Sequence, residues 1–88
     1  MTAEPWTVEF ERRAEKDLER LDPKVKQRVL SAIGQLAEDP GSADLRRLKG
    51  RAESRLRVGD WRVIIELDVA SRTIIIERIL PRGRAYNR

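Results

Sequence analysis

The sequence contains no cysteine and no histidine. The absence of Cys excludes disulfides, thiolate catalysis and Cys-based metal sites. The absence of His removes the commonest metal ligand and the commonest general base. A zinc enzyme and a Ser-His-Asp hydrolase are therefore excluded, and neither a metal nor another cofactor is expected.

Long apolar runs are also missing. No apolar run exceeds four residues, whereas a helix needs about 18 to span a bilayer. No basic stretch followed by an apolar segment marks a secretory signal. We therefore expect a cytoplasmic protein with no membrane partner.

The charge is modest in sum but divided along the chain. The 88 residues carry 19 Lys+Arg and 15 Asp+Glu, a formal net charge of +4. The half up to residue 44 has 7 basic and 10 acidic side chains, whereas the half from residue 45 has 12 and 5. Fifteen of the basic residues are Arg, whose planar guanidinium matches phosphate oxygens. The composition indicates a polyanionic partner.

The length allows one domain, residues 1–88, and the apolar periodicity predicts an α+β fold in the order β-α-α-β-β-β. Helices are expected over 12–21 and from Asp22-Pro23 to Asp39-Pro40. At the start of the second helix, Asp22 can cap the helix and Pro23 suits its first position. We predict strands over 5–10, 54–58, 61–67 and 73–80, a loop over 42–53, and a basic tail over 81–88. These elements would form one sheet, its last three strands an antiparallel meander, covered on one face by the two helices.

The dipeptide Gly59-Asp60 predicts a two-residue hairpin, in which Gly supplies the positive φ that such turns need. A hairpin of this length fixes the register, so Arg57 should face Arg62. Because side chains alternate between the faces of a sheet, one face should pack on the helices. That face would carry Leu56, Val58, Trp61, Val63, Ile65 and Leu67, and the opposite face Arg55, Arg57, Arg62, Ile64 and Glu66.

The second face is a candidate binding surface. Arg57 and Arg62 would be like-charged neighbours with Cβ atoms about 5 Å apart, an arrangement that costs stability. Arg82 shares strand parity with Arg78 and Leu80, and also with Ile74 and Ile76, so we expect it at this face or its rim, with Tyr86 close by. Cations for phosphate and a ring for stacking are the two elements of single-stranded nucleic acid binding.

Plainer interpretations exist for several residues. A charged sheet face is often only solvated. Trp6 and Trp61 have the parity of core residues. Glu53, Asp60 and Glu66 could act as general bases, but each has a simpler explanation. Glu53 would be a solvated loop residue, Asp60 a turn residue, and Glu66 a partner of Arg62 on the same face.

Several motifs occur together in one order. They are Leu48-Lys49-Gly50, the hairpin from Arg55 to Ile64 (RLRVGDWRVI), an acidic turn, an apolar strand, and Arg82-x-x-x-Tyr86. In this order, and with the helical hairpin ending at Asp39-Pro40, the chain resembles the RelE/ParE toxin superfamily of type II toxin-antitoxin systems over almost its whole length.

The resemblance implies a small toxin that an acidic, partly disordered antitoxin neutralises. In the RelE branch it implies a metal-independent endoribonuclease that cuts mRNA in the ribosomal A site. The catalytic residues would be Arg62, Arg82 and Tyr86. The side chains that contact RNA would be Arg55, Arg57, Lys49 and Arg84.

The sequence departs from the family pattern in two places. Pro81 stands where many relatives have His or another polar residue, and Arg replaces Lys at 55 or 57, which removes a titratable amine. Two alternatives remain: a ParE-like inhibitor of DNA gyrase without hydrolytic activity, and a catalytically silent module that binds RNA or antitoxin. The ParE branch generally lacks the terminal Arg and Tyr, so their presence favours RelE.

Overall fold

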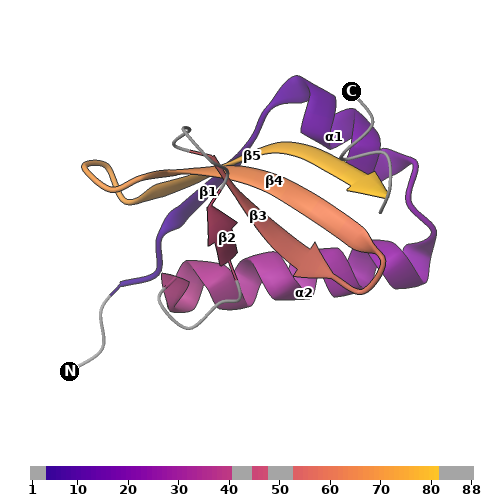
Figure 1. Cartoon of the computed structure of the whole chain (residues 1–88), viewed down its shortest axis with the longest axis horizontal. Helices are drawn as coiled ribbons and strands as arrows, with labels where there is room; N and C mark the ends of the chain where they lie inside the picture. The colour runs from indigo at the N-terminus through magenta and orange to yellow at the C-terminus, as the bar shows by residue number, and fades with distance from the viewer. Residues whose placement is uncertain (1–3, 41–44, 48–52, 82–88) are drawn as a thin grey trace.

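The structure is a computed structural model that describes residues 4–40, 45–47 and 53–81. It contains two helices and one five-stranded sheet with the strand order β1-β5-β4-β3-β2 (Figure 1). The elements are β1 (Thr7–Phe10), α1 (Arg12–Glu19), α2 (Pro23–Glu38), β2 (Leu45–Arg47), β3 (Glu53–Val58), β4 (Trp61–Asp68) and β5 (Thr73–Pro81). The predicted α+β class and the predicted element order are confirmed.

The two helices supply the apolar layer that covers one face of the sheet. Pro23 is the first residue of α2, as its sequence predicts, although the Asp22 side chain makes no capping hydrogen bond. The buried residues of this layer are Ala14 of α1, Leu21 between the two helices, and Val29, Ile33, Leu36 and Ala37 of α2. Neither helix of the described part of the chain is long and apolar enough to cross a membrane.

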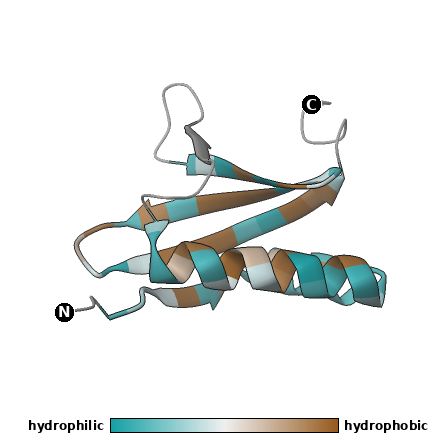
Figure 2. Cartoon of the chain, turned by 90° about the horizontal axis from the view of Figure 1, so that it is seen from below, coloured by the Kyte–Doolittle hydropathy of each residue, from teal (hydrophilic) through white to brown (hydrophobic). Residues whose placement is uncertain are grey.

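The β3–β4 hairpin has the predicted register. Val58 pairs with Trp61 and Arg57 with Arg62, and Gly59 in the turn has φ 59°. All six residues predicted to face the helices belong to the core or pack against it. Apolar and hydrophilic bands alternate along these strands in Figure 2, as expected for a sheet with one buried face.

The segment predicted as a loop over 42–53 contains a short strand. In β2, Leu45 pairs with Leu56 and Arg47 with Ser54, and β3 begins at Glu53. Three residues are too few to show an alternating pattern, so the periodicity could not indicate this strand. The sheet therefore has five strands, with β2 at one edge.

The other edge of the sheet is shared by β1 and α1. β1 runs parallel to β5 but reaches only from Thr73 to Ile76, and α1 lies beside β5 as well (Figure 1). Beyond β1, the carboxylate of Asp17 accepts hydrogen bonds from the Ile79 N–H (2.9 Å) and from Arg78 Nε (2.8 Å). The helix thus provides a hydrogen-bond acceptor for a backbone N–H of β5 at the part of this edge that β1 does not reach.

A β-bulge interrupts the pairing of β4 with β5. Ile64 pairs with Arg78 and Ile65 with Ile76, so Glu77 is an additional residue of β5. The bulge changes the parity that the sequence predicted for this strand. Ile74 and Ile76 are fully buried in the core, whereas Arg78 and Leu80 pair with Ile64 and Arg62 of the opposite face.

Candidate nucleic-acid interface

We call the sheet surface opposite the helices the open face. The alternation of β3 and β4 places Arg55, Arg57, Arg62, Ile64 and Glu66 on it, as predicted, because Leu56, Val63 and Ile65 between them are core residues. Arg55, Arg57 and Arg62 lie toward the hairpin end, and we call these three residues the basic zone.

Arg62 is the member of the basic zone that lies on β4. Its neighbours across the strands are Arg57 of β3 and Leu80 of β5. Arg62 is only 7% exposed, whereas Arg57 is exposed. The Nε atoms of Arg55 and Arg62 are shielded from solvent. Side chains packed in this way present guanidinium groups from fixed positions, which favours recognition of a defined anion over loose attraction.

The Arg57–Arg62 pair is unfavourable for folding. Like charges directly opposite each other in an antiparallel pair are destabilising, by up to about 1 kcal/mol relative to a neutral pair. An anion bound between the two guanidinium groups would remove that cost. The pair is therefore a candidate position for binding an anion.

The other residues that the sequence singled out have three outcomes. Lys49, Arg82, Arg84 and Tyr86 lie outside the described residues, so their places in the site stay predictions. Trp6 and Trp61 pack against the core, in agreement with their predicted parity. Asp60 lies in the β3–β4 turn.

The open face also carries an acidic zone, which we define as Glu11, Glu53, Glu66 and Glu77. Glu53 and Glu66 are direct cross-strand neighbours. Glu77 comes from the bulge of β5, and Glu11, just after β1, donates its N–H to the Ile76 carbonyl (2.9 Å). Sequence reasoning found Glu53 and Glu66 singly but missed the zone, because neither the bulge nor the place of β1 beside β5 has a local signal.

The acidic zone changes the protonation of one member. Burial, a hydrogen bond with Glu53 and the charges of Glu53, Glu11 and Glu66 raise the pKa of Glu77 to about 7. At neutral pH a proton is therefore partly shared within the zone. Among the described residues, no group of three or more acidic, His or Cys side chains could hold a metal ion.

One ion pair near the open face has a structural role. Asp17 of α1 binds Arg78 through two hydrogen bonds of 2.8 and 3.2 Å. Burial alone would raise the pKa of Asp17, but the hydrogen bonds from Arg78 and from the Ile79 N–H lower it below its usual value. Arg78 is thus engaged with the helix, so we do not assign it to the basic zone.

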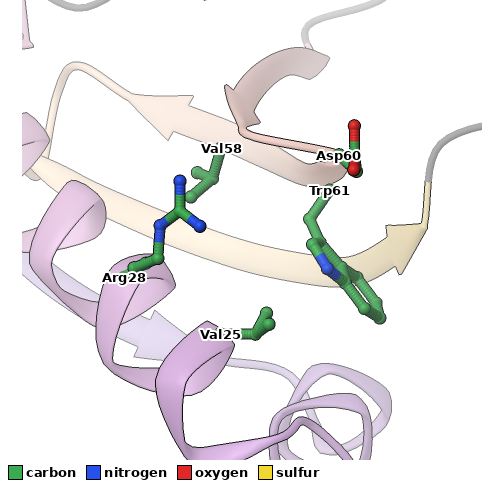
Figure 3. A pocket seen from close by; sticks show the side chains of 5 residues that line it. All are labelled: Val25, Arg28, Val58, Asp60 and Trp61. Atoms are coloured by element: carbon green, nitrogen blue, oxygen red, sulfur yellow. The ribbon is translucent and has the colours of Figure 1, made fainter.

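A cavity of about 120 Å³ lies between α2 and the β3–β4 hairpin. Figure 3 shows Arg28 extending from α2 toward Val58, while the carboxylate of Asp60 points away from the helix. The lining consists of Val25, Arg28, Val58, Asp60 and Trp61. Pockets for organic ligands measure about 300 to 1,000 Å³, so this cavity is too small for a nucleotide.

Comparison with solved structures shows the same fold in toxins bound to their antitoxins. The RelBE2 complex of Mycobacterium tuberculosis aligns with a TM-score of 0.76 and 28% identity, covering 90% of this chain and 100% of that chain. The RelE–RelB complex of Pyrococcus horikoshii aligns with a TM-score of 0.78 and 28% identity, covering 92% and 99%. Isolated Escherichia coli RelE has a TM-score of 0.78 at 14% identity over 92% of this chain and 88% of that chain, which shows the fold alone.

Sequence comparison agrees with the fold. Toxin RelG of Mycobacterium tuberculosis is 32% identical over 88 residues, covering 96% of this chain and 99% of RelG. The family described as ParE toxin of type II toxin-antitoxin system, parDE, matches residues 8–86. The chain therefore belongs to this ParE toxin family, within the RelE/ParE superfamily of type II toxins that its motifs resemble.

Proposed function

We propose that the protein is a cytoplasmic, ribosome-dependent endoribonuclease that cleaves mRNA in the ribosomal A site. The observation that carries the proposal is the Arg57–Arg62 pair with Arg55 beside it on the open face. Three guanidinium groups on one sheet face suit the phosphates of a single strand. Similarity to RelG and to RelE proteins supports the same choice.

The proposed reaction is a phosphoryl transfer within the RNA. The 2′-OH attacks the adjacent phosphate, its proton is taken up, and the 5′-oxygen leaves with a proton, which gives a 2′,3′-cyclic phosphate and a 5′-OH. Arg62 and Arg82 stabilise the charge that develops on the phosphate oxygens, and such donors contribute about 3 to 4 kcal/mol each. Tyr86 stacks on a base or accepts the 2′-OH proton.

Other residues hold the substrate and the ribosome orients it. Arg55 and Arg57 bind the RNA backbone, and Lys49 and Arg84 add further phosphate contacts. Because the chain has no His, the ribosome contributes by fixing the mRNA in a reactive geometry. The cognate antitoxin, a small acidic and partly disordered protein, neutralises the toxin by folding onto it.

Translation of a defined mRNA with purified toxin, followed by mapping of the 5′ ends, tests this proposal. Cleavage is expected with the wild type and with Arg13→Gln, a control that removes one exposed Arg from α1. Arg62→Gln and the Arg82→Ala/Tyr86→Ala double variant should lose cleavage by about 100-fold or more. Uncut mRNA, or undiminished cleavage by these variants, would rule the assignment out.

Inhibition of DNA gyrase is the second candidate, because the family that matches is described by the name ParE. A supercoiling assay separates the two functions. Inhibited gyrase with intact mRNA would reverse our ranking. If RNA binds with a steep salt dependence but without turnover, the chain is a silent binding module.

A further inference from the structure

The proposed cleavage of RNA leaves one proton without an assigned donor. The 5′-oxygen must take up a proton as it departs, and a positioned acid accelerates such a step. The chain has no His, the side chain that most often donates protons at neutral pH. A donor on the open face would have to lie beside the arginines that hold the phosphate.

The β-bulge of β5 brings a carboxyl group to that place. Glu77 is the additional residue of the strand, next to the residue that pairs with Ile64. Arg62 and Ile64 are two residues apart on the open face of β4, so Glu77 lies diagonally across from Arg62. Such diagonal neighbours are about 7 to 8 Å apart and are within reach of long side chains. Bulges often re-aim a side chain next to an active site, and this one places Glu77 at the boundary of the basic zone.

The surroundings of Glu77 keep a proton on it near neutral pH. The side chain is half-buried, and burial is the first cause that raises its pKa to about 7. A hydrogen bond with Glu53 and the negative charges nearby act in the same direction. These charges belong to Glu53 of β3, Glu66 of β4 and Glu11, which precedes α1. A carboxyl group in this setting can both hold a proton and release it at neutral pH.

The cations around Glu77 do not oppose this state. Arg78, next to it in β5, is bound to Asp17 of α1. Arg55 and Arg62 lie on β3 and β4, on the open face where the phosphate would bind. A bound phosphate adds negative charge beside Glu77 and favours its protonated form. The carboxyl would therefore carry its proton when the substrate is in place.

We propose that Glu77 is the general acid of the reaction and protonates the leaving 5′-oxygen. The inference rests on the proposed function, because it requires RNA cleavage at the basic zone. As the bond from the 2′-oxygen to phosphorus forms and the bond from phosphorus to the 5′-oxygen breaks, the proton of Glu77 passes to the 5′-oxygen. The 2′-OH proton goes to Tyr86 or to water, and water then returns a proton to Glu77. The hydrogen bond with Glu53 retains the proton until the 5′-oxygen replaces Glu53 as its acceptor.

A synthetic mRNA with sulfur in place of the 5′-oxygen at the mapped cleavage position tests this role. Sulfur needs no proton donor to leave, because a thiol has a pKa of about 8.5. Single-turnover cleavage on ribosomes is measured for the normal and the sulfur-substituted mRNA. Glu77→Gln should cleave the normal mRNA about 100-fold more slowly than the wild type does, and the sulfur-substituted mRNA at a rate within about threefold of the wild type.

Two control variants separate this role from a general loss of activity. Glu19→Gln removes an exposed carboxyl group from α1 and should match the wild type on both mRNAs. Arg62→Gln should be slow on both, because charge develops on the phosphate oxygens whichever atom leaves. Thermal melting checks that each variant folds.

The wild type provides a second test that needs no variant. Its rate on the normal mRNA should fall as the pH rises above about 7, where Glu77 loses its proton. This decrease should be absent with the sulfur-substituted mRNA. The same decrease with both mRNAs would show that another group causes it and would overturn the inference.

The outcomes also separate this inference from the proposed function. If the wild type cleaves and Glu77→Gln is as fast on the normal mRNA, or equally slow on both mRNAs, only the inference is wrong. A wild type that cleaves neither mRNA would defeat the proposed function, and the inference with it.

Discussion

Glu77 is a residue whose charge depends on pH near neutrality. Its pKa is raised to about 7, first by burial and then by Glu53 and the other members of the acidic zone. In the unfolded chain it would titrate near its ordinary value of 4.5. Between these values the folded state holds more protons than the unfolded state, so the free energy of unfolding falls as the pH rises.

We expect Glu77→Gln to flatten this dependence. The wild type should lose stability from about pH 5 to about pH 8, by about 1 kcal/mol once solvent screening is allowed for. The variant, which cannot ionise at this position, should lose less. Urea denaturation at several pH values measures the difference, and parallel curves for the two proteins would contradict it.

Arg57 illustrates a conflict between stability and binding. Replacement by Thr, a good strand former, removes the repulsion of Arg62 and should raise the free energy of unfolding by about 0.5 kcal/mol. The same change should weaken RNA binding. Urea midpoints and oligonucleotide titrations measure both effects, and a variant that loses stability as well as binding would show that the pair is not repulsive in the folded protein.

At the scale of elements, the attachment of α1 to β5 depends on Asp17. Asp17→Asn keeps the shape of the side chain but removes the charge that binds Arg78 and the second carboxylate oxygen. We expect a loss of about 1 to 3 kcal/mol and faster hydrogen exchange at the Ile79 amide. Asp22→Asn is the control, since the Asp22 side chain makes no capping bond, and an equal loss there would refute the assignment.

The β3–β4 turn depends on Gly59. Its φ of 59° is strained for a residue with a side chain, while a Cβ there would have ordinary contact with Arg28, 3.5 Å away. Gly59→Ala should therefore cost about 1 to 2 kcal/mol through the backbone. Gly34→Ala in α2, where a Cβ meets no atom within 4 Å, should instead stabilise by about 0.5 to 1 kcal/mol. Thermal melting of both variants tests the contrast.

Local signals determined which elements the sequence could predict. The Gly59-Asp60 turn and the alternation on either side of it fixed the faces of β3 and β4, and therefore the basic zone. The bulge at Glu77, the short β2 and the position of β1 beside β5 depend on partners distant in the chain. The acidic zone depends on the bulge and on the position of β1 beside β5. The sequence therefore showed only its separate residues.

At the scale of the whole molecule, the basic half of the chain does not form a uniformly positive surface. The arginines of β3 and β4 gather at the hairpin end of the open face, and glutamates occupy the other end. A short RNA should therefore contact only part of the face. The salt dependence of binding reports how many cations are involved.

The basic zone offers three cations for contact with phosphates. If all three make such contacts, a plot of the logarithm of the RNA association constant against the logarithm of the salt concentration should have a negative slope of at least about 2 in magnitude. Arg62→Gln should reduce the magnitude by about 0.7, and the control Arg13→Gln should not change it. Titrations at several salt concentrations measure the slopes, and equal slopes for all three proteins would place the RNA elsewhere.

The pairing of β1 with β5 joins one of the earliest segments to be synthesised to one of the latest. Thr7 lies beside Thr73, and Phe10 beside Ile76. Contacts so distant in sequence form late, and on a translating ribosome they must wait until β5 has left the exit tunnel. Only seven residues follow β5, so a growing chain lacks the completed sheet until it is released from the ribosome. Topology alone thus delays the toxin fold until the whole chain has been made.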